Sequence, residues 1–310
     1  GKLTKEQIKA GYSALKKIDE CISKSDFGSK LVAACDAFYT RIPHCFGMRT
    51  PPLIRTKDEV KLKIELLETL GDIEIAMKIL KEELDENPID SHYKALMCGL
   101  SPLANTSPDF KMIETYAKNT HAKTHSHYSI NVEDVFEVDH PTNSDFADHG
   151  NRKLLWHGSR LTNWVGILKQ GLRIAPPEAP VTGYMFGKGV YFADMCSKSA
   201  NYCYTNRRQN TGLLLLSEVS LGETNDLLSA DYDAADLPAG CHSVKGCGSV
   251  GPDPKDDFQM ENGTVVPMGK GIETGVTNPN GYTLNYNEYI VYDTKQIKMK
   301  YLVKCQFNYK

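Results

Sequence analysis

The stretch KLLWHGSRLTNWVGILKQGLRIAPPEAPVTGYMFGKGVYFADMCSKSANY, residues 153–202, decides most of what this sequence predicts. Its apolar run LLW ends in His157-Gly158-Ser159, as a buried strand does when it delivers polar groups to a cleft. A second run, GVYFA at residues 189–193, follows a segment rich in proline and glycine, which we expect to form a long binding loop or lid. The two strands are therefore predicted to frame a cleft.

The composition is that of a globular protein with one large domain or two ordinary ones. The chain has 310 residues, 41% of them hydrophobic, and its formal net charge of -3 gives no nucleic-acid footprint. Nine cysteines without a CxxC pair predict free thiols in a reducing compartment. No apolar run approaches the length of a membrane helix, so we expect no membrane association. The first residue is Gly and not Met, so we expect an excerpt of a longer protein.

The first quarter of the chain is predicted to be helical. Thr4 with Gln7, and Thr56 with Glu59, match the capping box that begins a helix. Apolar residues then recur every three or four positions across residues 60–84 and predict a long amphipathic helix.

The polar side of that long helix carries an acidic row, Glu65, Glu68 and Asp72. A row of this kind is usually a solvated surface, and the residues alone favour that interpretation. The alternative, in which the row faces a ligand, requires this side of the helix to lie against a cleft.

Strands dominate the sequence after Pro88. Ser107-Pro108 first predicts one more helix, with Ser as its cap and Pro at its first position. Residues 130–138 and 213–221 then read as strands, the second of them buried. Residues 297–307 alternate apolar and polar side chains, which predicts a half-exposed antiparallel strand.

Two apparent motifs are rejected. GCGSVG at residues 246–251 matches a dinucleotide-binding pattern, but it follows no predicted strand and leads to prolines rather than to a helix, so we expect a flexible loop. His121, His125 and His127 lack cysteine or carboxylate partners at metal-binding spacing and predict an ordinary polar loop without zinc.

Five residues remain as candidates for chemistry: His157, Tyr191, Ser199, Tyr202 and Glu288. Tyr202 is predicted to share a helix face with the residues three and four positions before it. Glu288 enters the aromatic strand YNEYIVY, where a carboxylate is more often an exposed strand end than a catalytic group. Composition alone leaves both possibilities for Glu288 open.

Several long blocks together resemble the catalytic region of the poly(ADP-ribose) polymerases. The blocks are LLWHGS, APPEAPVTGYMFGKGVYFAD, SKSANYC and YNEYIVY, and they are similar to the nuclear, DNA-damage-dependent members. The opening GKLTKEQIKAGYSALKKI, with LGDIEIA and HGSRLTNWVGIL, looks closest to the second branch of these nuclear enzymes. The resemblance covers the whole chain, and so many blocks in the right order leave little room for chance.

The resemblance implies an α+β protein with two parts. Residues 1–86 would be an all-helical regulatory subdomain that lacks its first helix, and residues 87–310 an ADP-ribosyltransferase fold of two facing mixed sheets. The order of helices and strands in the sequence agrees with that expectation. Cys45 stands where the family has an acidic residue, and this sequence stops at Tyr309-Lys310, short of the family's usual few extra residues ending in Leu-Trp.

The resemblance also implies roles for named residues. The catalytic triad would be His157, Tyr191 and Glu288. The residues expected to bind NAD are Gly158, Ser199 and Tyr202 at the nicotinamide and Ser159, Asn163 and Arg173 on the adenosine side. Lys198 and Met185 would lie near the acceptor, and Glu65, Glu68 and Asp72 would be regulatory, since their helix aligns with the family's autoinhibitory one.

The implied activity is the transfer of ADP-ribose from NAD to proteins and elongation of the polymer in the DNA damage response, in the nucleus and without a metal. A carboxylate such as Glu288 suits the oxocarbenium-like state that forms when nicotinamide leaves the ribose. Expected partners are protein acceptors, including the enzyme itself and chromatin proteins, and the histone PARylation factor, whereas DNA breaks would act only through domains outside this chain. The alternatives are a mono-transferase, an NAD glycohydrolase and a non-catalytic module that binds NAD or ADP-ribose.

Overall fold

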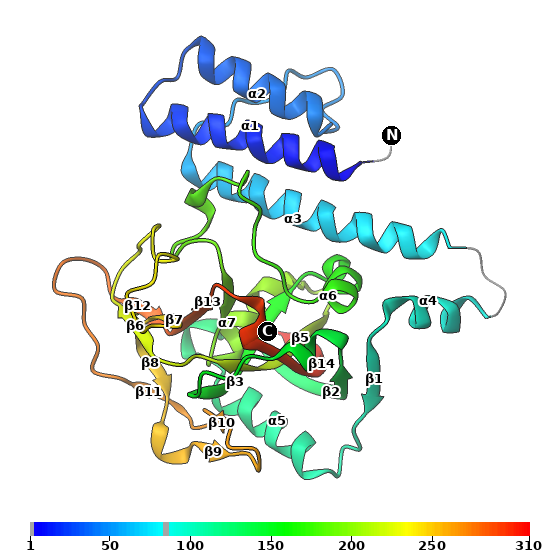
Figure 1. The fold of residues 1–310 in the computed structure, drawn as a ribbon, viewed down its shortest axis with the longest axis vertical. Helices are drawn as coiled ribbons and strands as arrows, with labels where there is room; N and C mark the ends of the chain where they lie inside the picture. Colours follow the sequence, from blue (N-terminus) through cyan, green and yellow to red (C-terminus); the bar gives the residue numbers. More distant parts are fainter. Residues whose placement is uncertain (1–2, 83–86) are drawn as a thin grey trace.

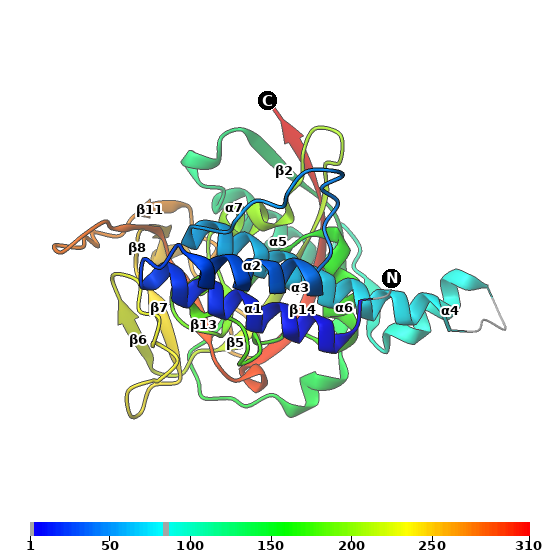
Figure 2. The ribbon, with the colours of Figure 1, turned by 90° about the horizontal axis from the view of Figure 1, so that it is seen from above.

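The computed structural model describes residues 3–82 and 87–310 and places a layer of helices against a body of mixed sheets (Figure 1). The layer contains α1 (Lys5–Ser23), α2 (Ser29–Arg41) and α3 (Lys57–Leu80). α1 packs against both α2 and α3, and all three cross the top of the body (Figure 2). Their apolar sides form one core, in which Leu15 and Phe38 are fully buried.

Both predicted helix starts are confirmed. Thr4 and Gln7 make the two reciprocal bonds of a capping box at the start of α1. Thr56 accepts a bond from the backbone of Glu59 at the start of α3, and its hydroxyl donates to the Glu59 carboxylate. α3 ends at Leu80, so the predicted helix is too long by at least Lys81 and Glu82, which form a turn. Residues 83–84 of the predicted helix, and the predicted domain boundary after residue 86, fall on residues outside those described.

Two further helices precede the first long strand. α4 (Pro88–Leu96) begins with Asn87 as its cap. α5 (Pro108–Asn119) begins where the sequence predicts, because the Ser107 side chain accepts a bond from the backbone of Phe110. In the described part of the chain, no helix is both long and apolar enough to span a membrane.

The strands of the described residues form three sheets. The largest has the order β1 (Gly99–Pro102), β2 (Tyr128–Asp139), β14 (Ile297–Tyr309), β5 (Thr211–Ser220), β3 (Arg152–Ser159), β10 (Val265–Val266) and β9 (Phe258–Gln259). β14 runs antiparallel to both of its neighbours, β2 and β5, as its alternating sequence predicts. A helix-rich first part followed by mixed sheets confirms the expected α+β class.

Two smaller sheets complete the body. One has the order β4 (Val190–Phe192), β13 (Glu288–Val291), β7 (Ser243–Gly246) and β6 (Thr224–Leu227). The other has the order β11 (Gly271–Glu273), β8 (Gly248–Pro252) and β12 (Leu284–Tyr286). A bridge between Trp156 and Ala193 joins the end of β4 to β3 in the large sheet. The two strands predicted to frame a cleft are therefore neighbours from different sheets.

The large sheet is covered on both faces, because successive side chains of a strand point to opposite sides. In β3, Leu154 and Trp156 belong to a core shared with α5 and α7 (Cys196–Ala200). Leu155 belongs to a second core, shared with α6 (Trp164–Gln170), β4 and β13. The polar residues at the end of β3 therefore belong to a strand that is held by packing on both of its faces.

The expectation of a flexible loop at residues 246–251 is wrong. These residues end β7 and form most of β8. The glycines are needed for close packing, since a Cβ on Gly248 would lie 2.2 Å from the backbone carbon of Tyr286. A short 3-10 turn at residues 254–256 follows in place of a helix, so the rejection of a dinucleotide motif stands.

Candidate active site

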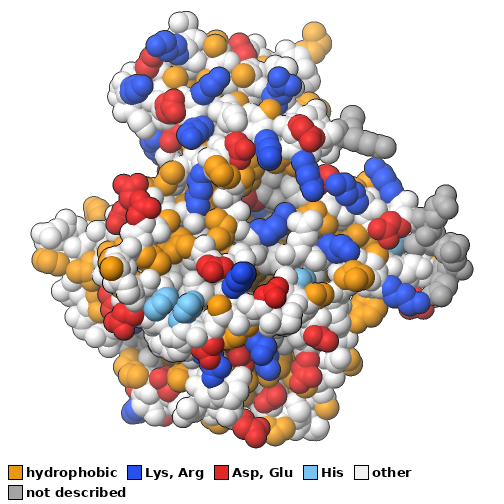
Figure 3. Space-filling model, viewed as in Figure 1, with side chains coloured by type: hydrophobic (Ala, Val, Ile, Leu, Met, Phe, Trp, Pro, Cys, Tyr) orange, Lys and Arg blue, Asp and Glu red, His pale blue; other side chains and the backbone are white. Residues whose placement is uncertain are grey.

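A cavity of about 720 Å³ lies between the helical layer and the sheets, a usual size for a site that takes a small molecule. The surface is hollowed where the two parts meet (Figure 3). α1 and α3 line one side, and β3, β4, α7 and the start of β13 line the other. Every residue that the sequence suggested for catalysis, binding or regulation lines this one cavity.

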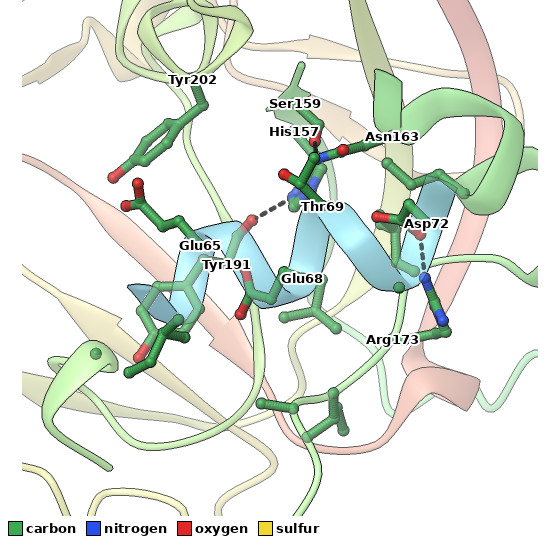
Figure 4. A pocket seen from close by; sticks show the side chains of 18 of the residues that line it. Glu65, Glu68, Thr69, Asp72, His157, Ser159, Asn163, Arg173, Tyr191 and Tyr202 are labelled. Atoms are coloured by element: carbon green, nitrogen blue, oxygen red, sulfur yellow. Dashed lines mark hydrogen bonds and ion pairs between the residues drawn. The ribbon is translucent and has the colours of Figure 1, made fainter. Parts of the chain in front are cut away.

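His157 is held near the end of β3 by its own ring nitrogen. Nδ1 donates to the carbonyl oxygen of Tyr191, 2.8 Å away on β4 (Figure 4). Burial lowers the pKa of His157, and the bond to Tyr191 opposes that shift. A neutral imidazole with its proton on Nδ1 keeps Nε2 as a hydrogen-bond acceptor. Nε2 of His157 can therefore accept a hydrogen bond from a hydroxyl group.

The ring of Tyr191 is fixed by the glycine-rich turn before it. Its hydroxyl donates to the carbonyl of Gly187 at 2.6 Å and accepts from the backbone N–H of Phe186 at 2.9 Å. Both bonds hold the polar tip of the side chain, and burial raises the pKa of Tyr191, so the hydroxyl stays neutral. What Tyr191 offers to the cavity is its aromatic ring.

Glu288, the first residue of β13, is paired with Lys198 of α7. Lys198 Nζ lies 3.1 Å from Glu288 Oε1, and their side chains are 20% and 15% exposed. Burial lowers the pKa of Lys198, and the negative charge of Glu288 opposes the shift. The strand-end carboxylate is thus a partly buried group with one defined cation beside it.

Three residues surround the space next to this pair. Gly158 must be glycine, because a Cβ there would lie 2.0 Å from the carbonyl oxygen of Ser199. The Ser199 hydroxyl donates to the carbonyl of Trp156 at 3.0 Å, which leaves its oxygen lone pairs for a ligand donor. Tyr202 remains 45% exposed, so its ring is available to stack on a flat group. Tyr202 follows α7 in a 3-10 turn and not in the same helix as Ser199.

The other end of the cavity carries the residues expected on the adenosine side. Asn163 donates from Nδ2 to the hydroxyl of Ser159 at 2.9 Å. Arg173 makes an ion pair and a hydrogen bond with Asp72 of α3 (Figure 4). A side chain expected to bind the substrate is therefore occupied by one expected to regulate it.

The acidic row of α3 faces the cavity and is not a solvated outer surface. Glu68 accepts a hydrogen bond from the hydroxyl of Tyr184, and Asp72 is only 7% exposed. Although Glu68 is accessible, that surface lies inside the cavity, and burial among protein atoms raises its pKa to about 7. Burial likewise raises the pKa of Asp72 to about 6, against the pull of Arg173. The expectation of a solvated row is therefore wrong, because the helical pattern does not show what packs against the polar side of the helix.

Met185 and the loop around it close one corner of the cavity. The Met185 side chain packs against a small buried cluster that includes Phe186 and Ile290, and its carbonyl accepts from the backbone of Asp231. Met185 is therefore placed by the loop and by β13, close in the chain to Tyr191.

Among the aromatic and basic residues of this cavity that the sequence did not indicate are Tyr184, Tyr204 and Arg160. Tyr184 holds Glu68, and the guanidinium carbon of Arg160 lies 3.8 Å from the ring centre of Tyr204. Tyr184 stands inside the quoted turn GYMFG, so its neighbourhood was a usable signal. Tyr204 has a positive φ of 48°, which no sequence pattern here indicates.

Across the described ranges 3–82 and 87–310, no group of three or more histidine, cysteine or acidic side chains could hold a metal ion. His125 Nδ1 instead bonds to the buried hydroxyl of Ser197 at 2.7 Å. All nine cysteines lie in the described residues as free thiols.

The similarity to known proteins extends over the whole chain. The family described as the poly(ADP-ribose) polymerase catalytic domain matches residues 107–307, and the family's regulatory domain matches residues 1–93. Poly [ADP-ribose] polymerase 2 of Homo sapiens is 58% identical over 313 residues, and the match covers 100% of this chain and 54% of that relative. Poly [ADP-ribose] polymerase 2 of Arabidopsis thaliana is 51% identical and covered to 49%. Poly [ADP-ribose] polymerase 1 of Gallus gallus is 47% identical and covered to 31%.

The chain thus spans about half the length of the two polymerase 2 relatives. Its greater identity to these relatives than to the polymerase 1 relative confirms the expected resemblance to the second branch. Two matched domains in the expected order, and a cavity between them that gathers all the expected residues, agree with each other. The chain therefore belongs to the poly(ADP-ribose) polymerase family.

Proposed function

We propose that this chain transfers ADP-ribose from NAD to protein acceptors and elongates the product into a polymer, with release of nicotinamide. The observation that carries the proposal is the pairing of Glu288 with Lys198 in the cavity that also holds His157 and Tyr191. A non-catalytic binding module would have no use for a partly buried carboxylate at the mouth of an aromatic strand.

The reaction breaks the bond between the nicotinamide nitrogen and C1′ of the ribose, and nicotinamide leaves with the bonding electron pair. Positive charge then develops on the ribose, and the carboxylate of Glu288 stabilises it. The oxygen of an acceptor hydroxyl forms the new bond to C1′, and its proton passes to solvent. Glu288 can also accept a hydrogen bond from a ribose hydroxyl, and Nε2 of His157 can accept another, which orients the sugar.

The nicotinamide is proposed to lie between the rings of Tyr191 and Tyr202. Its amide would bond to the backbone of Gly158 and to the hydroxyl of Ser199. The fixed ring of Tyr191 and the exposed ring of Tyr202 suit this stacking role. A planar aromatic leaving group thereby meets two flat surfaces and a polar edge.

The adenosine side is proposed to be Ser159, Asn163 and Arg173, with the helices of residues 1–86 acting as a lid over it. The ion pair between Arg173 and Asp72 supports this, because NAD and α3 would compete for the same guanidinium. We propose that Glu65, Glu68 and Asp72 are regulatory, and that NAD enters when the lid opens.

On the acceptor side we propose Lys198 and Met185 as auxiliary residues. The proposed acceptors are proteins, including this enzyme itself and chromatin proteins, with the histone PARylation factor as a partner. The proposed setting is the nucleus during the DNA damage response, as the resemblance to the nuclear, DNA-damage-dependent members implies.

Incubation with labelled NAD, followed by gel analysis of protein products and measurement of free nicotinamide, tests the proposal. We expect released nicotinamide and a ladder of labelled protein products of increasing size. Products that carry one unit only would indicate a mono-transferase, and nicotinamide release without labelled protein would indicate a glycohydrolase. Bound NAD without either product would reduce the chain to a binding module.

A further inference from the structure

Asp194 is a buried carboxylate that the proposed chemistry does not use. It lies between β4 and α7, and 2% of it is exposed. Its Oδ2 accepts a hydrogen bond from Asn287 Nδ2 at 2.9 Å and a second from the Tyr289 hydroxyl at 3.0 Å. These two donors are the chain neighbours of Glu288 on either side.

The alternation of strand side chains explains the arrangement. Asn287, just before β13, and Tyr289 in β13 both reach Asp194 on one face, and Glu288 between them points to the other, so a group that holds the first two sets the position of the third. Asn287 is held from its other side as well, since its Oδ1 accepts from the backbone N–H of Gly248 at 2.9 Å. The strand end that carries Glu288 is therefore fixed from the face opposite to the cavity.

The segment around Asp194 also reaches the other elements of the cavity. The preceding residue, Ala193, exchanges two backbone hydrogen bonds with Trp156, the residue before His157. α7 begins two residues after Asp194 and carries Lys198, the partner of Glu288. One short stretch thus joins the elements that carry His157, Lys198 and Glu288.

Asp194 lowers the free energy of unfolding, because a buried carboxylate is destabilising unless it is paired. Its Oδ1 has no hydrogen-bond partner within the described residues. Burial raises the pKa of Asp194, while its two bonds and the positive charges of Lys153 and Lys245 lower it. These two lysines lie 5.5 and 5.7 Å from the ring centre of Tyr289. A half-satisfied buried charge of this kind points to a functional use.

We propose that Asp194 is a positioning residue for Glu288. By accepting from Asn287 and Tyr289, it fixes the start of β13 so that the Glu288 carboxylate meets Lys198 and the ribose. The inference rests on the proposed transfer reaction, but its geometric part concerns only the placement of Glu288.

The decisive variants change the hydrogen bonds that Asp194 accepts from Asn287 and Tyr289 in different ways. Asp194→Ala removes the acceptor, and Asn287→Asp sets a second carboxylate against it. We expect each to lower kcat per folded molecule about ten- to hundredfold, since a displacement of about 1 Å can cost a hundredfold in rate. Asp194→Asn keeps an oxygen that can accept both bonds, so kcat should stay within about threefold of wild type.

The double variant Asp194→Asn with Asn287→Asp exchanges donor and acceptor and should recover most of the rate that Asn287→Asp loses. Gln296→Ala is the matched control, because Gln296 is buried and donates two hydrogen bonds, to the carbonyls of Ser220 and His242, away from β13. It should lower the melting temperature comparably and leave kcat per folded molecule within about twofold.

Binding of nicotinamide separates positioning from general damage. Its dissociation constant should stay within about twofold in Asp194→Ala, since the loss is confined to turnover. A parallel loss of nicotinamide binding and of kcat, an equal loss in Asp194→Asn and Asp194→Ala, or no recovery in the double variant would each overturn the proposal.

If the wild type releases no nicotinamide, the proposed function is refuted, but the positioning of Glu288 by Asp194 can still be tested. Crystal structures of the variants provide that test. In Asp194→Ala the contact between Lys198 Nζ and Glu288 Oε1, 3.1 Å in the native protein, should be lost, and in Asp194→Asn it should persist. An unchanged contact in Asp194→Ala would show that Asp194 does not position Glu288.

Discussion

Glu288 and Glu68 line the same cavity from different walls, and their surroundings differ in kind. Glu288 begins a strand held between two neighbours and has Lys198 as its partner. Glu68 lies on a helix of the upper layer, its partner is the neutral hydroxyl of Tyr184, and burial raises its pKa to about 7. The strand wall therefore pairs its carboxylate with a cation, whereas the helical wall holds a carboxylate whose raised pKa lets it lose its charge near neutral pH.

The comparison extends to the partners of the two walls. The partner of Glu288, Lys198 of α7, belongs to the sheet body, so this contact does not depend on α1, α2 or α3. Contacts of Asp72 and Glu68 run from α3 to Arg173 and Tyr184 of the body, so they break when the helices move away. Acidic residues are thus held within the sheet body on one wall and across the two parts of the molecule on the other.

The largest expected effect tests the strand wall. Glu288→Gln keeps the shape of the side chain and removes its charge, so chain elongation should fall about a hundred- to thousandfold, the usual loss for one aligned electrostatic group of about 2.7 to 4 kcal/mol. Binding of NAD should persist. Product length on gels and NAD affinity by calorimetry measure the two effects. Glu273→Gln, an exposed strand carboxylate, is the control, and elongation within about tenfold of wild type would refute the role of Glu288.

The next effect tests the helical wall as a whole. Deletion of residues 1–86 should raise activity without DNA and tighten binding of a non-hydrolysable NAD analogue. If the open state is populated at about 1%, the gain in affinity is about a hundredfold. Calorimetry measures it, after a thermal melt has shown that the truncated protein is folded. Unchanged affinity in a folded truncation would leave α3 as a spacer.

A smaller effect concerns the ring of Tyr202, which remains accessible in the cavity. Tyr202→Ala should weaken nicotinamide binding more than Tyr202→Phe does, because stacking and not the hydroxyl makes the contact. Aromatic contacts contribute roughly 0.5 to 1.5 kcal/mol beyond burial, about two- to twelvefold in affinity. Calorimetric titrations of the two variants decide the point, and equal losses would indicate a hydroxyl contact instead.

The smallest effect is the pH dependence of the lid. The closed lid raises the pKa of Glu68 from its ordinary 4.5 to about 7, so the closed state binds the proton more tightly than the open one. Protonation therefore favours closure, and this contribution is lost as pH rises through about 7. The groups that act on Glu68 are Tyr184, Glu65, Asp72 and Arg173. Affinity for the NAD analogue should tighten severalfold as pH rises through this range.

Two variants isolate that titration. Glu68→Gln keeps an acceptor for Tyr184 without a titrating proton, so most of the pH dependence should disappear. Asp58→Asn neutralises an exposed carboxylate of the same helix and should leave the pH dependence intact. A pH profile that is the same in wild type and Glu68→Gln would assign the effect to another group.

Local signals in the sequence were enough to predict where several helices begin and where the longest strands lie. A capping residue such as Thr4 or Ser107 acts on a neighbour three positions away, so the pattern is visible without the fold. The alternation along residues 297–307 likewise reflects the two faces of one strand. Glycines were harder to interpret, because Gly248 lies in a strand for a reason that only Tyr286 supplies.

Sequence by itself identified the expected site residues of the cavity, since each family block that carries them is a continuous stretch of the chain, but it missed Tyr184, Tyr204 and Arg160. Only the tertiary structure decided what each of them faces. It turned the acidic row of α3 toward Arg173 and Tyr184, and it placed Asp194 behind Glu288. The physical reason is distance along the chain: Asp72 lies 101 residues from Arg173, and Asp194 lies 93 residues from Asn287. Contacts of that range depend on how whole elements pack, which no local pattern encodes.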